Sequence, residues 1–255
     1  MKIKTLLVII ALSCFQFVKA NNLEAYFMYS TYFSPEGAYV DTYISTIGNS
    51  AVFVENENGN YQAEIEITII FYKNAEIETF TKQVLKSPEI SDTLQSKPNF
   101  LDVQRIALNT GVYNMQLTIK DLNAPEEVYN FTDIINIKHE ADKFSFSSVQ
   151  FIESVEASNE ESVLTKHGYK MIPYISDFFP SNSDRLVFYT ELYNTQTLTD
   201  KSFLVTYYIS RLDNGKVLEQ FSRFKKMEPQ EFNVLLGEIN ISELYSGNYY
   251  LNIDI

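Results

Sequence analysis

Apolar and polar residues alternate with a period of two over most of the chain beyond residue 22. In the clearest run, residues 62–69, alanine and isoleucine alternate with glutamine, glutamate and threonine. Such alternation is typical of an antiparallel strand that turns one face to a core and the other to water. Similar runs predict strands at residues 39–47, 51–55, 101–108, 112–120, 128–137, 144–155, 186–193, 203–212, 217–224, 231–236 and 249–255.

No stretch combines a helical period with capping residues, so the pattern predicts an all-β protein. Short helical turns are expected only at residues 87–92 and 242–245. The 18 Tyr and 19 Phe agree with a strand-rich chain, because aromatic side chains favour strands.

Turn-forming residues separate these runs. Ser34-Pro35-Glu36-Gly37 places Pro and Gly where a type I turn prefers them. Asn58-Gly59 and Asn214-Gly215 each lie between strand-like runs, and Asn-Gly is a strong hairpin signal because both residues tolerate positive φ. The two Asn-Gly hairpins occupy comparable places in the two halves of the chain.

One pattern occurs twice. Leu108-x-x-Gly111-x-Tyr113 opens a run of alternating apolar residues, and Leu244-x-x-Gly247-x-Tyr249 repeats it at a constant offset of 136 residues. The recurrence indicates one β-unit built twice. Both glycines are expected to hold positive φ in equivalent turns.

The repeat predicts two tandem antiparallel β-sandwich domains of the Ig-like kind. The charged run at residues 138–143 marks the expected boundary, which gives domains at 22–140 and 143–255. A single closed barrel is the less favoured alternative, because the repeat divides the chain.

The first 20 residues are typical of a secretory signal peptide. Lys2 and Lys4 precede an apolar stretch over residues 5–18, and Val18-Lys19-Ala20 forms a small-residue cleavage site. The mature chain should begin near Asn21. The apolar stretch is shorter than the roughly 20 residues that a membrane span needs.

Cys14 is the only cysteine, and it lies in the segment expected to be removed. The mature chain would then have no disulfide, which suits a bacterial envelope, with a periplasmic or outer-membrane location. The alternative is lipidation of Cys14, although Ala11 stands where a lipobox has Leu. Membrane association is expected only in that case.

Removal of the signal peptide leaves 17 basic and 33 acidic residues, a net charge of −16. A surface with this charge repels phosphates and anionic lipid headgroups, which argues against nucleic acid as a partner.

Candidate chemistry is sparse, and we predict no catalytic, cofactor-binding or metal-binding residue. His139 and His167 stand far apart in the sequence, and there is no zinc motif and no G-x-S-x-G nucleophile motif. The oxygen-rich loop 121–127 suggests calcium, but it lacks the alternating acidic pattern of a dedicated site. A hydrolase with paired carboxylates stays open as a third hypothesis.

Tyrosines offer another functional lead. Tyr26, Tyr29 and Tyr32 recur at a spacing of three, and the pairs 207–208 and 249–250 should place one ring on each face of a strand. Solvent-facing rings stack sugars or anchor proteins. The competing interpretation is that these rings fill the core of a chain without Trp.

Several segments resemble the N-terminal region of the GWxTD-domain proteins of Bacteroidota. They are residues 32–40, 58–65, 85–92, 99–105 and 111–125. The chain contains no Trp, so the motif that names the family is absent. We expect either a shortened relative or a further C-terminal domain outside this chain. The resemblance implies a Gram-negative envelope location and no mechanism.

The sequence therefore predicts an exported, non-enzymatic interaction or scaffold protein of the cell envelope, with an envelope protein as its partner. A carbohydrate-binding module that uses exposed Tyr rings is the alternative, with a glycan as its ligand.

Overall fold

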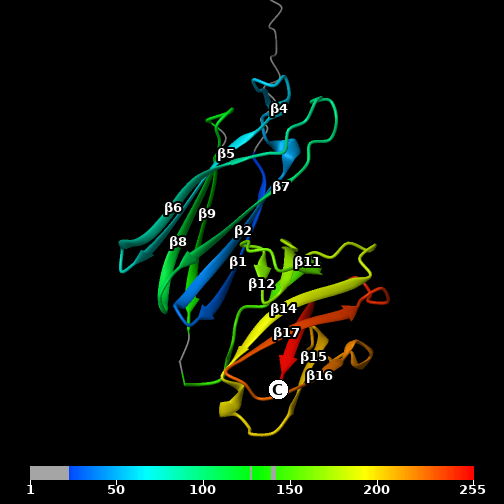
Figure 1. Ribbon diagram of the computed structural model, residues 1–255. Coiled ribbons are helices and arrows are strands. Elements are labelled where there is room, and N and C mark those ends of the chain that lie inside the picture. The colour runs from blue at the N-terminus through cyan, green and yellow to red at the C-terminus, as the bar shows by residue number, and fades with distance from the viewer. Residues whose placement is uncertain (1–22, 127, 139–141) are drawn as a thin grey trace, which may run out of the picture.

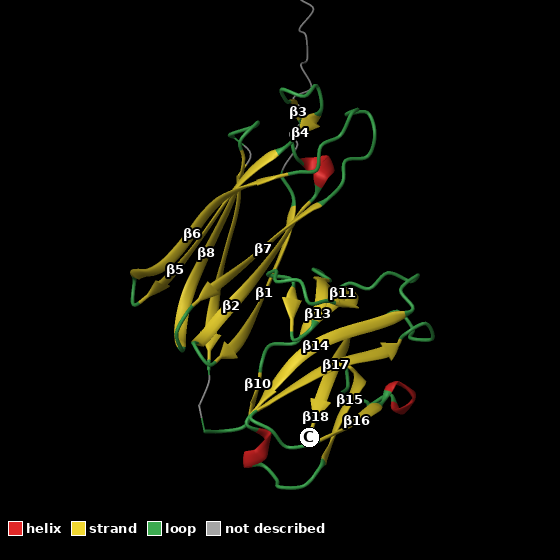
Figure 2. Ribbon diagram, viewed as in Figure 1, coloured by secondary structure: helices red, strands yellow, loops and turns green. Residues whose placement is uncertain are grey.

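The computed structural model describes residues 23–126, 128–138 and 142–255 (Figure 1). The all-β prediction is confirmed: the described residues form strands β1 to β18, and their only helical elements are three short 3-10 turns (Figure 2). The predictions for the signal peptide, Cys14 and His139 concern residues outside the described ranges.

The N-terminal half, residues 23–138, contains two larger sheets and a small hairpin. The order β1-β2-β7 joins Ala25–Ser34, Gly37–Thr46 and Phe100–Ala107. The order β6-β5-β8-β9 joins Glu76–Lys86, Glu64–Lys73, Gly111–Asp121 and Val128–Ile137. The hairpin pairs β3 (Val54–Glu55) with β4 (Tyr61–Gln62).

The C-terminal half, residues 142–255, contains two sheets. The larger sheet has the order β10-β14-β11-β13-β12, with β17 also paired to β14. Its strands are Ser145–Phe146, Arg185–Tyr193, Gln150–Ala157, Tyr169–Pro173, Thr165–Lys166 and Phe232–Asn240. The smaller sheet has the order β16-β15-β18 and joins Arg223–Met227, Phe203–Arg211 and Tyr249–Asp254.

The sheets pack as four successive layers. One apolar cluster fills the space between the two larger sheets of the N-terminal half, and another fills the space between the two sheets of the C-terminal half. A smaller cluster lies between β1-β2-β7 and the larger C-terminal sheet and contains Tyr32, Ile152, Met171, Val187 and Tyr189. The sheet β1-β2-β7 and the six-stranded sheet are therefore the inner layers, side by side in Figure 1.

The period-two alternation predicts the outer layers well. In β5, Ile65, Ile67 and Ile69 are fully buried, whereas the residues between them are half-exposed. Strands β2 and β14 differ, because they are buried on both faces. Their near-continuous burial follows from their position inside the stack.

Some element predictions are wrong. Residues 87–92 form no helical turn, since Ile90 bridges to Tyr61, whereas a single turn is found at 242–245, closed by Leu244 N–H on the Ile241 carbonyl. The strand expected at 217–224 is replaced by the 3-10 turn Glu219–Phe221, which buries Phe221 before β16 begins. Strands β1, β6, β12 and β13 were not predicted.

The predicted hairpins are confirmed. Ser34 pairs with Gly37 across the β1-β2 turn. Gly59 has a φ of 75° within the β3-β4 hairpin, and Gly215 has a φ of 68° in the turn that leads from β15 to the Ser210–Val217 bridge.

The repeated sequence pattern forms the same corner twice, where the chain leaves one sheet for the other (β7 to β8, and β17 to β18). The Tyr113 hydroxyl donates to the Asn109 carbonyl at 2.9 Å, and the Tyr249 hydroxyl donates to the Tyr245 carbonyl at 2.8 Å. A tyrosine that bonds to backbone a few residues upstream is typical of sandwich corners.

The prediction of positive φ at both corner glycines is half wrong: Gly111 has a φ of 155°, whereas Gly247 is not among the positive-φ residues. Both glycines leave room for neighbouring side chains. A Cβ at Gly111 would lie 3.2 Å from Lys73 Nζ and 3.4 Å from Tyr113 Cε2, and one at Gly247 would lie 3.2 Å from Tyr249 Cε2.

Candidate functional site

Charged side chains gather between the two halves. This interface cluster consists of Asp41 on β2, Arg105 on β7, Lys166 and His167 at the β12-β13 turn, and Glu191 on β14. The Asp41 carboxylate accepts from Arg105 Nε at 2.8 Å and from Arg105 Nη2 at 3.0 Å. Asp41 therefore binds one cation from its own half in a bidentate geometry.

Lys166 supplies the second cation to Asp41. Its Nζ lies 2.8 Å from Asp41 Oδ2, at angles too poor for a well-aligned hydrogen bond, so the contact acts as an ion pair. The same Nζ lies 3.2 Å from the ring centroid of Tyr32, within cation–π range. Burial lowers the pKa of Lys166 to about 8, against the opposing attraction of Asp41.

Glu191 is the second buried acid of the cluster. Its carboxylate accepts hydrogen bonds from Tyr189 at 2.6 Å and from Tyr193, and His167 Nε2 lies 3.4 Å away. Burial would raise the pKa of Glu191, but hydrogen bonds from His167, Tyr189 and Tyr193, together with the Lys166 charge, hold it below its usual value.

A two-residue turn positions the basic members of the cluster. Lys166 pairs with Tyr169, and between them His167 and Gly168 have φ values of 49° and 83°. Positive φ at both central residues is the type I′ geometry that suits a tight hairpin. The His167 ring packs on Phe232, with centroids 4.4 Å apart, which orients it beside Glu191.

The centre of the cluster is covered, whereas its outer members Arg105 and His167 have side chains that are 37% and 46% exposed. The side chains of Lys166, Asp41 and Glu191 are 5%, 0% and 1% exposed. A substrate would reach their reactive atoms only if the halves separated. Further bonds hold the halves together, since the hydroxyls of Tyr32 and Tyr43 donate to Gln150 at 2.7 and 3.0 Å.

A third buried acid lies elsewhere in the N-terminal half. Burial raises the pKa of Asp102, although Gln104 and Gln83 donate hydrogen bonds to it. Each of these buried carboxylates has its own donors, so the arrangement offers no shared carboxylate pair for hydrolysis.

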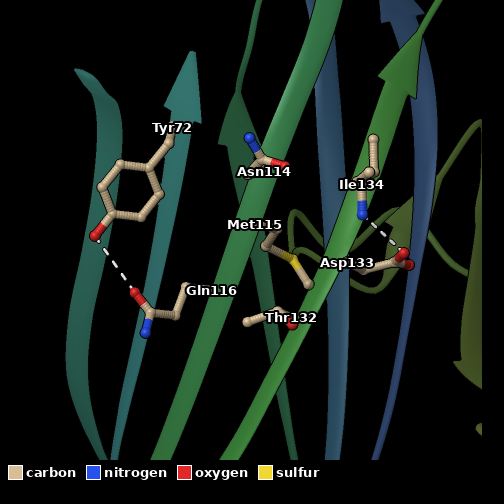
Figure 3. Close-up of a pocket in the computed structure, with 7 residues that line it drawn as sticks. All are labelled: Tyr72, Asn114, Met115, Gln116, Thr132, Asp133 and Ile134. Carbon is tan, nitrogen blue, oxygen red and sulfur yellow. Dashed lines mark hydrogen bonds between the residues drawn. The ribbon is translucent and has the colours of Figure 1, made fainter. Parts of the chain in front are cut away.

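An open depression lies on the solvent side of β5, β8 and β9 (Figure 3). Its volume is about 500 Å³, and it is lined by Tyr72, Asn114, Met115, Gln116, Thr132, Asp133 and Ile134. The Tyr72 hydroxyl donates to Gln116 Oε1 at 3.3 Å, so the floor combines an aromatic ring with amide groups.

Exposed apolar side chains surround this depression. Ile77, Phe80 and Ile134 are 57%, 63% and 63% exposed. The strand register places Phe80 beside Ile70, Ile77 beside Tyr72, and Ile134 beside Asn114. We call this solvent side of the four-stranded sheet the outer face. Large apolar side chains that are exposed together on one face of a sheet are typical of interaction surfaces.

Aromatic rings also line the solvent side of β16-β15-β18. Tyr207 and Tyr249 pack against the core, which confirms the prediction that each Tyr pair has one ring on each face. On the opposite face, Phe224 and Tyr250 are 74% and 54% exposed, and the register places Tyr208 diagonally between them. We call these three rings the aromatic row.

The N-terminal tyrosines form no platform. Tyr26 is exposed, Tyr29 packs against the first core, and Tyr32 is fully buried between the halves. A spacing of three alternates between the faces of a strand, so these rings cannot share one surface.

The loop 121–127, which suggested a calcium site, uses its buried acid for other hydrogen bonds. Asp121 is buried, and its carboxylate accepts from the backbone N–H groups of Val52 at 2.7 Å and Asn123 at 2.9 Å. Glu127 lies outside the described residues. Within the described ranges, no three His, Cys, Asp or Glu residues are grouped as metal ligands. The helical elements in these ranges are all too short to cross a membrane.

The sequence contains one signal for the interface cluster. Residues 186–189 are consecutively apolar, which indicates a strand buried on both faces, and Glu191 follows on that strand. An acid on such a strand must find donors. Nothing local identifies its partners, because Lys166 and His167 come from another strand pair.

A scan against family models matches none, and a search of curated proteins returns no match.

Proposed function

We propose that this protein is a non-enzymatic interaction module of a Gram-negative cell envelope, built from two tandem Ig-like sandwiches. Export is supported by the signal-like first 20 residues. The resemblance to the N-terminal region of GWxTD-domain proteins is part of the same proposal. The observation that carries the interaction function is the outer face, where Ile77, Phe80 and Ile134 surround an open depression.

The stacking of the sheets supports this choice of surface. The inner sheets use their faces to pack against each other, so only the two outermost sheets offer a broad face to solvent. The chemistry of the buried acids agrees with a structural role, because Asp41 is paired with two cations, Glu191 accepts hydrogen bonds from two tyrosines, and both carboxylates are covered. A broad exposed apolar face suits the binding of a partner protein better than it suits catalysis.

The test is recovery of a partner from envelope extract. We expect the double variant Phe80→Asp, Ile134→Asp to lose at least about tenfold of the retained partner at physiological salt, because exposed apolar anchors dominate interfaces. The matched control is Leu204→Asp, which changes an exposed apolar residue on β15. Equal recovery by all three proteins, or no partner at all, would refute the proposal.

The aromatic row favours a second candidate function, glycan binding. Phe224, Tyr208 and Tyr250 lie diagonally across three strands on one face, an arrangement that can stack successive sugar rings. The Tyr208 hydroxyl donates to Asp254 at 2.9 Å, which fixes that ring.

Titration with envelope and dietary polysaccharides tests this candidate through Tyr fluorescence. Binding should weaken about tenfold in Phe224→Ala and in Tyr250→Ala, in line with the loss of one stacked ring. Tyr26→Ala, an exposed ring elsewhere, is the control. A flat signal across a glycan array would remove the candidate.

A further inference from the structure

Three loop segments meet at one end of the C-terminal half. We call them together the loop end, and they are residues 174–184, 211–217 and 241–248. Backbone hydrogen bonds join them: Ile241 N–H donates to the Asp184 carbonyl at 2.8 Å, and Leu212 N–H donates to the Asn248 carbonyl at 2.9 Å. The loop end lies where β14 begins, whereas the link to the N-terminal half enters beside the other end of that strand. Loops at the ends of rigid sheets commonly carry recognition.

The first segment of the loop end holds an exposed phenylalanine in a fixed position. Phe178 is 70% exposed, although the next residue, Phe179, packs against the second core. The Phe178 carbonyl accepts from the Tyr174 hydroxyl at 2.5 Å, and the Phe178 N–H donates to Ser176 Oγ at 3.0 Å. Tyr174 in turn stacks on Phe179, with ring centroids 4.7 Å apart. The ring of Phe178 therefore lies in solvent although its backbone is held in place.

The corner segment exposes a second ring, and the sequence repeat shows that the corner does not need it. Tyr245 is 87% exposed, while its carbonyl accepts the corner hydrogen bond from Tyr249. In the first corner the equivalent position is Asn109, whose carbonyl accepts the same bond from Tyr113. The two corners thus make one backbone contact with different side chains. The aromatic ring at position 245 is therefore not required by the turn that carries it.

The third segment of the loop end adds an aliphatic side chain. Leu212 is 45% exposed. The residues on either side of it, Arg211 and Asp213, form two hydrogen bonds of 3.0 and 2.7 Å with each other, and Gly215 N–H donates to the Arg211 carbonyl at 2.9 Å. Each of the three segments is thus held by its own hydrogen bonds. Apolar side chains on loops of this kind lose little conformational entropy when they bind.

The charge of the loop end indicates the chemistry of its partner. The two segments that expose aromatic rings contain no Lys or Arg, and their acids are all exposed: Asp177, Asp184 and Glu243. In the third segment Asp213 is paired with Arg211. The surroundings of both rings are therefore acidic. Such a surface attracts lysine and arginine side chains and repels acidic surfaces, including a second copy of this chain, whose net charge is −13.

We propose that the loop end binds a partner protein whose surface has apolar pockets bordered by lysine or arginine. Phe178 and Tyr245 are its anchors, and Leu212 packs beside them. Burial of the two rings in pockets supplies most of the affinity, because a few aromatic anchors dominate protein interfaces. The acids around the rings pair with the basic border and speed association. The loop end lies on the other half of the chain from the outer face, and its binding is independent of that face.

Photo-cross-linking from the loop end, followed by binding to the purified partner, tests this proposal. The full chain with Phe178→benzoylphenylalanine is irradiated in envelope extract, and the cross-linked protein is identified by mass spectrometry and purified. We expect this protein to bind the unmodified chain and to bind more weakly as the salt concentration rises, because salt screens the attraction between the acids and a basic border.

The sequence repeat supplies a matched pair of variants. Tyr245→Asn copies the residue of the first corner, so its urea midpoint should match that of the unmodified chain, whereas its binding to the purified partner should weaken at least about tenfold. Phe178→Ser should weaken binding to a similar extent. The control Asn109→Tyr adds a ring to the other corner and should bind like the unmodified chain. The double variant Phe80→Asp, Ile134→Asp should also bind normally, which separates this site from the outer face.

Three results would overturn the proposal. The first is the absence of any cross-linked protein from position 178. The second is a partner that binds Tyr245→Asn as tightly as it binds the unmodified chain, and this variant decides the question if Phe178→Ser does not fold. The third is cross-linking to a glycan or to an acidic protein whose binding does not weaken with salt.

Discussion

At the scale of single residues, the corner tyrosines explain why the chain repeats itself. Tyr113 and Tyr249 each reach back four residues to a carbonyl, and a glycine lies against each ring. The repeated sequence thus encodes a hydrogen bond and a close contact at the point where the chain changes sheet.

Tyr113→Phe should lower the free energy of unfolding by about 1 to 1.5 kcal/mol, because it removes a part-buried hydrogen bond made by a ring that is itself fully buried. Tyr249→Phe should cost less than about 1 kcal/mol, since that ring is only partly buried and water can replace the hydroxyl. Urea unfolding of both variants measures the difference. An unchanged midpoint for Tyr113→Phe would show that the corner bond contributes nothing.

At the scale of elements, the interface cluster fixes how two sheets meet. Asp41 binds Arg105 of its own sheet and Lys166 of the facing sheet, so the charges of two layers neutralise one another. Buried pairs of this kind can be replaced at little cost by apolar residues, whereas removal of one partner leaves an uncompensated charge.

Substitutions of Lys166 and of Asp41 should therefore differ in their effect on the free energy of unfolding. Lys166→Met should change stability by no more than about 1 kcal/mol, because Asp41 keeps Arg105 and the methionine fills the same space. Asp41→Ala should cost about 3 to 5 kcal/mol, because Lys166 and Arg105 then face each other without an acid. Thermal and urea unfolding test the pair, and an equal loss in both variants would contradict this account.

At the scale of the whole molecule, groups buried at the interface between the halves should make the stability of the fold change with pH in the alkaline range. Burial is the main cause of a raised pKa in Tyr32, Tyr39, Tyr43, Tyr189 and Tyr193. The unfolded chain loses these protons near pH 10, so their contribution is complete below pH 10 and is lost as the pH rises further. Lys166 acts in the opposite direction, because its pKa is lowered.

The expected pH profile follows from these signs. Between pH 8 and pH 10 the unfolded chain holds the Lys166 proton more tightly than the folded protein does, so stability rises by at most on the order of 3 kcal/mol. Above pH 10 it falls steeply. The midpoint of urea unfolding, followed from pH 7 to 11, should pass through a maximum, and Lys166→Met should remove the rise while it keeps the fall. A monotonic profile in the unmodified protein would show that the pKa of Lys166 is not lowered in the folded state.

The sequence by itself determined the all-β class, most strand positions, the three predicted turns and the repeated corner. These features are local: period-two alternation, Asn-Gly dipeptides and one short motif specify them without reference to distant residues. Strand β6 escaped prediction because, as an edge strand, most of its residues are exposed and it shows little alternation.

Only the tertiary structure decided which surfaces remain open and which charges are buried. Asp41 and Arg105 are 64 residues apart, and Lys166 approaches them from the other half, so no pattern along the chain joins them. A period-two pattern indicates which residues of a strand point towards a core. Which sheet covers them depends on how the sheets stack. The stacking is decided by contacts between segments that are far apart in the sequence.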